Sequence, residues 1–333
     1  MKGLKNSRNP TSEPKDTYKI AYVLHFFLGA GNLLPWNALI TAIDYFGYLY
    51  PNKHVEKVFS VAYMASSLCI LGVLLSWDWC RKRLSFRLRM NLGFSMFVLS
   101  LMVTPIMHWI WHRNGLKMKS SMGFNLVVAT VVICGLADGL IAGSLIGTAG
   151  KLPRQYMQAI FAGTASSGVL ISILRIITKA SLPQTPHGLK ASANLYFLAR
   201  FLAESIESNL FKDWYPVMLI AIYNISDFVG KSLTGIYVLE SIGKATWGCI
   251  GRILFYPMFS VCFRGPEWLR TEVPVVVLTL MLGLSNGYLT SVIMILAPKA
   301  VPAPEAEIAA IVMVVFLGMG LVAGSLVGWF WII

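Results

Sequence analysis

Long apolar runs separated by short polar segments make up most of this sequence. A helix that crosses a bilayer needs about 20 apolar residues, and nine runs reach or approach this length. Because hydrocarbon offers no hydrogen-bonding partners to the backbone, each run is predicted to be helical. The predicted spans are residues 18–46, 58–79, 90–111, 124–150, 156–180, 214–239, 246–263, 273–296 and 308–333.

The segment 181–213 interrupts this pattern. Its one apolar stretch, 193–203, begins like a span and is then cut off by Glu204 and Glu207. A helix of that length rises about 16 Å, roughly half the hydrocarbon thickness. We predict a helix that lies in the membrane interface, or a truncated span. The predicted organisation is a polar tail (1–17), a first half-bundle of five spans (18–180), a shortened connection (181–213) and a second half-bundle of four spans (214–333).

Composition supports a polytopic membrane protein and excludes two other classes. Apolar residues make up 56% of the chain and charged residues 13%, whereas a soluble domain carries about 25% charged residues. High hydrophobicity also excludes intrinsic disorder. The five cysteines and five histidines show no metal-ligand spacing except His108 and His112, which an interfacial aromatic belt explains better than a metal. No nucleophile elbow or His/Asp cluster is present. We therefore expect no metal, no organic cofactor and no enzyme activity.

The net charge of +13 comes from 28 Lys and Arg against 15 Asp and Glu. In a membrane protein such an excess collects in cytosolic loops and against anionic lipid, so we expect contact with lipid and no nucleic-acid partner. The dense cluster from Arg81 to Arg89 and the Lys and Arg residues of the polar tail decide the orientation. They predict a multi-pass protein with a cytosolic N-terminus, and an odd span count then puts the C-terminus on the other side.

Charged residues inside the predicted spans need a reason, because each costs about 2.5 to 3.5 kcal/mol at the bilayer centre. Asp227 and Lys231 lie four residues apart, so they share one helix face and can pair. With Asn224 nearby, they are either an ion pair that fixes helix packing or the wall of a water-filled cavity, and we favour the cavity. Asp138 and Arg175 have no partner on their own helices, so a structural partner elsewhere and a substrate role both stay open.

Glycines recur every fourth residue in two spans. We expect both stripes to be packing seams that let a second helix approach closely. In the first span, Pro35 lies between Asn32 and Asn37. A helix broken at its centre and flanked by polar groups is typical of the binding sites of secondary transporters. The two glycine stripes are Gly135, Gly139, Gly143 and Gly147, and Gly320, Gly324 and Gly328.

Four motifs in matching order resemble the equilibrative nucleoside transporters. The segment Gly-Asn-Leu-Leu-Pro-Trp-Asn at 31–37 resembles the first-span signature of that family. Asp-Phe-Val-Gly-Lys at 227–231 is similar to its Asp-x-x-Gly-Arg motif, with Lys in place of Arg as in plant members. Residues 284–291 resemble its tenth span, and 152–168 its fourth-to-fifth-span segment. The resemblance covers nearly the whole chain.

This resemblance implies a fold and a function. The fold is all-α, with two half-bundles like those of the major facilitator architecture around a central cavity. The function is movement of nucleosides such as adenosine and uridine by alternating access, either facilitative or coupled to protons. The plasma membrane is expected, with the vacuolar membrane as the alternative. Trp36 would stack on the base, Asp227 would accept from ribose hydroxyls and Lys231 would hold Asp227 ionised. The implied substrate-binding residues are Asn32, Trp36, Asn37, Asn224, Asp227, Lys231 and Asn286.

The chain departs from this family in its span count, because family members have eleven spans. Residues 193–203 read as a join between the start of the sixth span and the end of the seventh. Most of both spans is then absent. The alternative function is therefore a truncated variant that does not transport, or that regulates full-length transporters.

Overall fold

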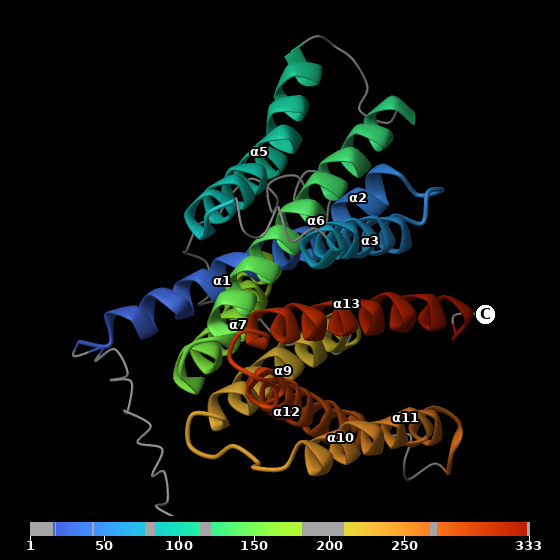
Figure 1. The fold of residues 1–333 in the computed structure, drawn as a ribbon. Helices are drawn as coiled ribbons and strands as arrows, with labels where there is room; N and C mark the ends of the chain where they lie inside the picture. Colours follow the sequence, from blue (N-terminus) through green and yellow to red (C-terminus); the bar gives the residue numbers. More distant parts are fainter. Residues whose placement is uncertain are drawn as a thin grey trace, which may run out of the picture.

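The computed structural model describes residues 16, 18–41, 43–76, 84–113, 121–181, 210–266 and 272–331. Over those residues every regular element is a helix (Figure 1). The predicted helix at 193–203 lies outside them. The longer helices are α1 (Ile20–Thr41), α3 (Val55–Ser76), α5 (Phe86–Arg113), α6 (Ser121–Gly150), α7 (Arg154–Ser181), α9 (Leu210–Leu233), α12 (Glu272–Leu296) and α13 (Ala306–Trp331). The shorter ones are α2 (Ile43–Leu49), α10 (Ile242–Gly251), α11 (Phe255–Arg264) and the 3₁₀ turns η1 (Arg252–Leu254) and η3 (Ala297–Lys299).

Seven of the described helices are long and apolar enough to cross a membrane: α1, α3, α5, α6, α7, α12 and α13. This confirms the predicted class, an all-α polytopic membrane protein. α9 has 24 residues, which is long enough, but Asn224, Asp227 and Lys231 lower its hydropathy. α10 and α11 have 10 residues each and are individually too short. The span count of nine, which needs α9 and the α10–α11 pair, stays a prediction.

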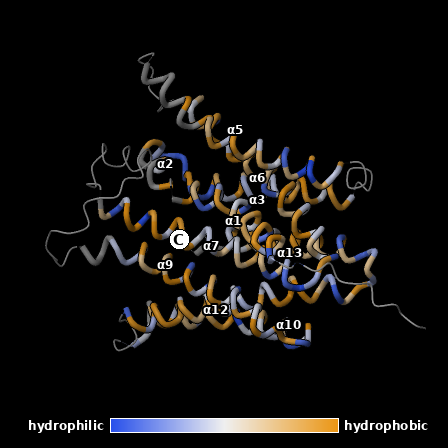
Figure 2. Tube along the Cα trace, turned by 90° about the vertical axis from the view of Figure 1, so that its left-hand side faces the viewer, coloured by the Kyte–Doolittle hydropathy of each residue, from blue (hydrophilic) through white to orange (hydrophobic). Residues whose placement is uncertain are grey.

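Most of the helix pairs that pack together are not consecutive in the chain (Figure 1). α1 lies along α7, α9 along α12, and α7 also contacts α9. α6 packs against both α3 and α5. The last helix, α13, does not lie along α9 or α12 but packs against α3 and α6 of the first predicted half-bundle. Coloured by hydropathy, the helices are apolar over most of their length (Figure 2).

The first glycine stripe is a packing seam, as predicted. A Cβ atom on Gly135 would overlap the Tyr63 carbonyl, and one on Gly139 would overlap the Ser67 carbonyl, both on α3. The prediction for the second stripe is wrong over its described part. A Cβ atom on Gly320 or Gly324 would meet nothing within 4 Å, so none of the described helices is seated against these two glycines.

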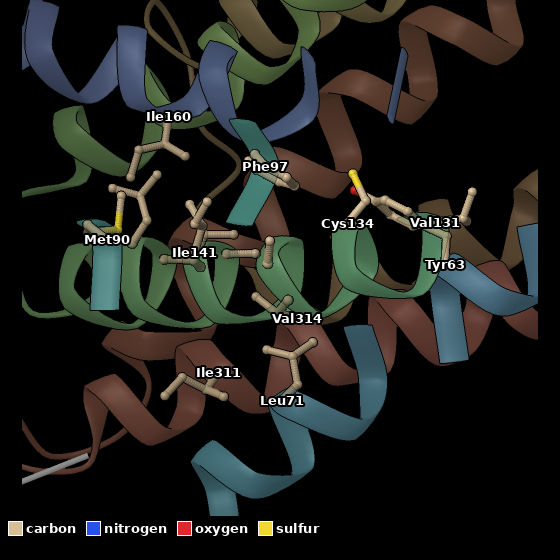
Figure 3. Packing of buried hydrophobic residues seen from close by; sticks show 14 of the residues in the cluster. Tyr63, Leu71, Met90, Phe97, Val131, Cys134, Ile141, Ile160, Ile311 and Val314 are labelled. Atoms are coloured by element: carbon tan, nitrogen blue, oxygen red, sulfur yellow. The ribbon is translucent and has the colours of Figure 1, made fainter. Parts of the chain in front are cut away.

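The core lies where α6 meets α3 and α13 (Figure 3). Val131 and Ile141 of α6 are fully buried, and they belong to the same cluster as Leu71 of α3 and Ile311 of α13. Large apolar side chains also face outward, among them Leu99, Trp247 and Phe316. Outward apolar surface of this extent fits a hydrocarbon solvent rather than water.

Three predicted spans differ most from the helices of the structure. α1 continues through Pro35 and ends at Thr41, so its centre is not broken. α9 ends at Leu233 rather than 239, because the Thr234 hydroxyl donates to the Lys231 carbonyl and the chain turns at Gly235. The run predicted at 246–263 is two helices separated by η1. Pro257 has no N–H for the carbonyl four residues earlier, which explains an interruption at 252–254.

α13 is tied to the first half of the chain by ion pairs at its N-terminal end. Glu307 pairs with Lys151, which follows α6, and its carboxylate lies 4.0 Å from the Arg89 guanidinium on α5. The Arg89 side chain is only 5% exposed, whereas that of Lys151 is 47% exposed. One acidic side chain of α13 therefore contacts a buried and an exposed cation at once.

Candidate functional site

The predicted ion pair inside α9 is present. Lys231 Nζ lies 2.7 Å from Asp227 Oδ2, one helical turn away. Asp227 is 7% exposed and Lys231 9% exposed. A buried charge is costly unless it is paired, and this pair satisfies each member with the other. The polar sequence of α9 thus folds into an ion pair within the bundle.

Two residues from other elements extend this pair into a polar network. Asn286 of α12 donates its amide to Asp227 Oδ1 at 2.7 Å. The amide oxygen of Asn286 in turn accepts from Arg252 Nη2 at 2.9 Å. Arg252 lies in η1, and the interruption between α10 and α11 brings its guanidinium to α12. Both carboxylate oxygens of Asp227 are therefore occupied, one by an ammonium and one by an amide.

Arg252 is the residue that sequence reasoning missed. It falls inside the predicted span 246–263, where it has no acidic residue one turn away. Its nearest polar partner, Asn286, is 34 residues further along the chain. The one available signal is a charge within an apolar run, which is costly and so indicates a partner elsewhere.

The two outer asparagines of the predicted site both contact α7. Asn37 of α1 donates to Ser167 Oγ at 2.9 Å. Asn224 of α9 donates to Ser172 Oγ at 2.8 Å and to the Gly168 carbonyl at 3.3 Å. α7 therefore carries the polar surface that connects the first span to the helix of the ion pair.

The remaining predicted residues, Asn32 and Trp36, form a separate group. They lie one turn apart on α1, and the Trp36 ring stands 4.3 Å from the Tyr63 ring of α3. Asn32 is 6% exposed, and its Oδ1 has no hydrogen-bond donor among the described residues. The structure therefore brings Asp227, Lys231 and Asn286 together, and it places Asn32 and Trp36 in a second group.

The network contains a carboxylate and an amide, and the second group contains an amide and an aromatic face; groups of these kinds can bind hydroxyls and flat rings. In the part of the chain that the structure describes, no cluster of three or more His, Cys, Asp and Glu side chains can hold a metal ion. The fold and the site thus define a polytopic membrane protein with a polar network inside its bundle.

Comparison with known proteins identifies the family. The family model described as "Nucleoside transporter" matches residues 128–206 and 198–333. Similar proteins include "Equilibrative nucleotide transporter 8" of Arabidopsis thaliana, 54% identical over 96% of this chain and 97% of that protein. "Equilibrative nucleotide transporter 1" of the same plant is 41% identical over 96% of this chain and 88% of that protein. This chain belongs to the nucleoside transporter family.

The same comparisons bear on the shortened connection. The alignment with the 54% identical relative extends over 384 positions, more than the 333 residues of this chain. That relative therefore has residues with no counterpart here. The two family-model matches meet at 198–206, inside the predicted short connection 181–213. A chain shortened at this place agrees with the prediction, and the identity of the missing spans as the sixth and seventh stays a prediction.

Proposed function

We propose that this protein carries nucleosides across a membrane by alternating access between two half-bundles (18–180 and 214–333), and that it is not an enzyme. Family membership supports the substrate class, and the names of its relatives refer to nucleotides. The single observation that carries the proposal is the buried Asp227–Lys231 pair with Asn286 on its second oxygen. A carboxylate held in this way can exchange its amide partner for a substrate hydroxyl without losing its cation.

In this proposal each group has a separate task. Asp227 accepts from ribose hydroxyls, and Lys231 keeps it ionised and fixes its orientation. Asn286 is the partner that the ribose displaces. Trp36 stacks on the base, with Asn32 and Asn37 bonding to the base edge, while Asn224 joins α9 to α7. Base–aromatic stacking is worth about 1–3 kcal/mol per base.

We also propose an orientation and a location. The N-terminal tail lies in the cytosol, because the tail and the dense Arg81–Arg89 cluster give one side of the membrane the excess of Lys and Arg. The plasma membrane is the proposed site, with the vacuolar membrane as the alternative. Labelling of a cysteine placed at Ser85, from one side of sealed vesicles and then the other, tests the orientation.

The decisive experiment separates charge packing from substrate contact. Asp227→Asn alone leaves Lys231 buried without its carboxylate, so it is expected to lower both membrane abundance and uptake. The double variant Asp227→Asn/Lys231→Gln has no unpaired charge at this pair and is expected to regain abundance. If Asp227 binds ribose, uptake of adenosine and uridine per molecule stays lost in the double variant. Recovery of uptake along with abundance would reduce the pair to packing.

Two further measurements complete this test. Lys231→Arg keeps a cation at the same helix position and is expected to retain uptake. AMP is added as a competitor, because the network contains two cations, Lys231 and Arg252, and only one carboxylate, Asp227. The excess positive charge can bind a phosphate group. Competition by AMP as strong as that by adenosine would change the proposed substrate from nucleosides to nucleotides.

A further inference from the structure

Asn32 of α1 carries a hydrogen-bond acceptor that the helix bundle does not use. Its side chain is only 6% exposed, and its Oδ1 accepts from no donor among the described residues. A buried acceptor without a donor is costly, because it has lost water and gained no other partner. A donor group on a bound ligand would remove this cost. The second group of the candidate site therefore contains one position that fits a ligand N–H or O–H.

Asp138 of α6 fixes the orientation of this amide. Its carboxylate accepts from Ser67 Oγ of α3 at 2.9 Å, and the Tyr63 hydroxyl and the Asn32 side chain are its other hydrogen-bond partners. Asp138 thus has structural partners on both α1 and α3. An ionised carboxylate only accepts, so Asn32 must turn its N–H groups toward it. The Oδ1 atom is then left for another donor, and rotation of the amide would set two acceptors against each other.

Trp36 provides an aromatic surface beside this acceptor. It lies one turn beyond Asn32 on the same face of α1, and its ring stands 4.3 Å from that of Tyr63. Trp36 and Asp138 are both partly exposed, so accessible space borders the group although Asn32 itself is buried. A base that stacks on Trp36 therefore has its polar edge within one turn of α1 from the Oδ1 of Asn32.

We propose that Asn32 selects nucleosides whose base carries an exocyclic amino group, such as adenosine and cytidine; this inference rests on the proposed function, in which Asn32 binds the base edge without a stated preference. An amine N–H donates to Asn32 Oδ1 and leaves the contact with Asp138 intact. Inosine and uridine carry a carbonyl oxygen in place of the amine. That oxygen would face the Oδ1 acceptor, and the amide cannot turn to meet it while Asp138 is ionised. These bases must therefore shift to offer a ring N–H.

The first experiment removes the amine from the substrate. Uptake of labelled adenosine into proteoliposomes is inhibited with unlabelled adenosine, with 6-methylaminopurine riboside, which keeps one N–H, or with purine riboside, which has none at this position. Purine riboside is expected to compete about ten-fold less well than adenosine, because it leaves the acceptor unsatisfied, whereas the methylamino analogue should stay close to adenosine. Asn32→Leu should abolish the difference, and Gln158→Leu, which removes a different buried amide, should keep it. Equal competition by adenosine and purine riboside in the wild type overturns the proposal.

The second experiment reverses the amide. Asp138→Asn supplies an N–H to Asn32 Oδ1, so the Asn32 amide is free to offer its own N–H to the base. The preference for adenosine over inosine, measured as the ratio of their dissociation constants for the purified full chain, is expected to fall about ten-fold or to reverse. Asp138→Glu keeps an acceptor and should retain the wild-type ratio. An unchanged ratio in Asp138→Asn overturns the proposal, whatever the effect on abundance. Absence of nucleoside uptake and binding in the wild type defeats the proposed function and this inference with it, whereas uptake that does not distinguish adenosine from purine riboside defeats the inference alone.

Discussion

Gly287 of α12 lies directly against the carbonyl oxygen of Asp227 on α9. A Cβ atom at residue 287 would come closer than 3.0 Å to this oxygen and to the backbone nitrogen of Lys231. Gly230 of α9 makes the reciprocal approach to the backbone of α12 at Leu284. The two backbones are thus close enough for Asn286 to reach Asp227, so the packing of small residues sets the geometry of the polar network.

Gly287→Ala is expected to separate α9 and α12 and to weaken the Asn286–Asp227 hydrogen bond. Overpacking of this kind costs about 1–3 kcal/mol, and uptake should fall because the Asp227–Lys231 segment of α9 is pushed out of position. Thermal unfolding in detergent and adenosine uptake per molecule measure the two effects. Gly320→Ala is the matched control, since its Cβ would meet nothing within 4 Å, and it should be neutral. Equal effects of the two substitutions would contradict this account of the helix contact.

Arg252 and Asn286 are expected to be coupled energetically. Hydrogen bonds to charged groups contribute about 1.5–3 kcal/mol, and a double-mutant cycle with Arg252→Leu and Asn286→Leu should return a coupling of that order. Arg252→Gln keeps a donor without the charge, so it separates the hydrogen bond from electrostatics. Because Arg252 holds Asn286 on Asp227, from which ribose must displace it, Arg252→Leu should also lower the KM for adenosine. Additive stabilities with an unchanged KM would leave Arg252 as a packing residue.

Arg89 and Lys151, which both pair with Glu307, are expected to contribute unequally to the free energy of unfolding because Arg89 is buried and Lys151 is exposed. Arg89→Gln removes a buried partner, which typically costs about 3–5 kcal/mol. Lys151→Gln removes an exposed one, which costs about 0–1 kcal/mol and less at high salt. Thermal unfolding of both variants at low and high salt tests this order. Equal destabilisation, or a salt-dependent effect of Arg89→Gln, would show that the Arg89 end of α13 is more solvated than the structure indicates.

The sequence predicts those features that lie within one helix better than those that depend on two. The pairing of Asp227 with Lys231 follows from a spacing of four, and the seam at Gly135 and Gly139 follows from a repeat of four. In contrast, the Arg252–Asn286 contact joins two helices, and no local pattern encodes its distance. Pro257 explains the break at 252–254. The apolar run 246–263 nevertheless has the length of a membrane span, so the sequence predicts a single helix there. Pro35 has the same chemistry, but α1, which packs along α7, continues through it.

The glycines of α13 lead to the last prediction. A glycine repeat predicts a seam only if a partner helix is present, and Gly320 and Gly324 have no neighbour within the described structure. The chain also lacks residues that its 54% identical relative contains, and two spans are predicted to be absent around 193–203. A second half-bundle with fewer helices leaves its polar groups closer to lipid, and each poorly satisfied group costs several kcal/mol in hydrocarbon. Insertion of the relative's extra residues at 198–206 is therefore expected to raise thermal stability in detergent and nucleoside uptake per molecule.

Gly324→Leu serves as an internal control, because it should be tolerated in the short chain and harmful in the restored one if the inserted helices cover α13. Equal stability and uptake of the two chains would mean that the additional spans are dispensable, whereas uptake by the restored chain alone would identify this protein as the non-transporting variant.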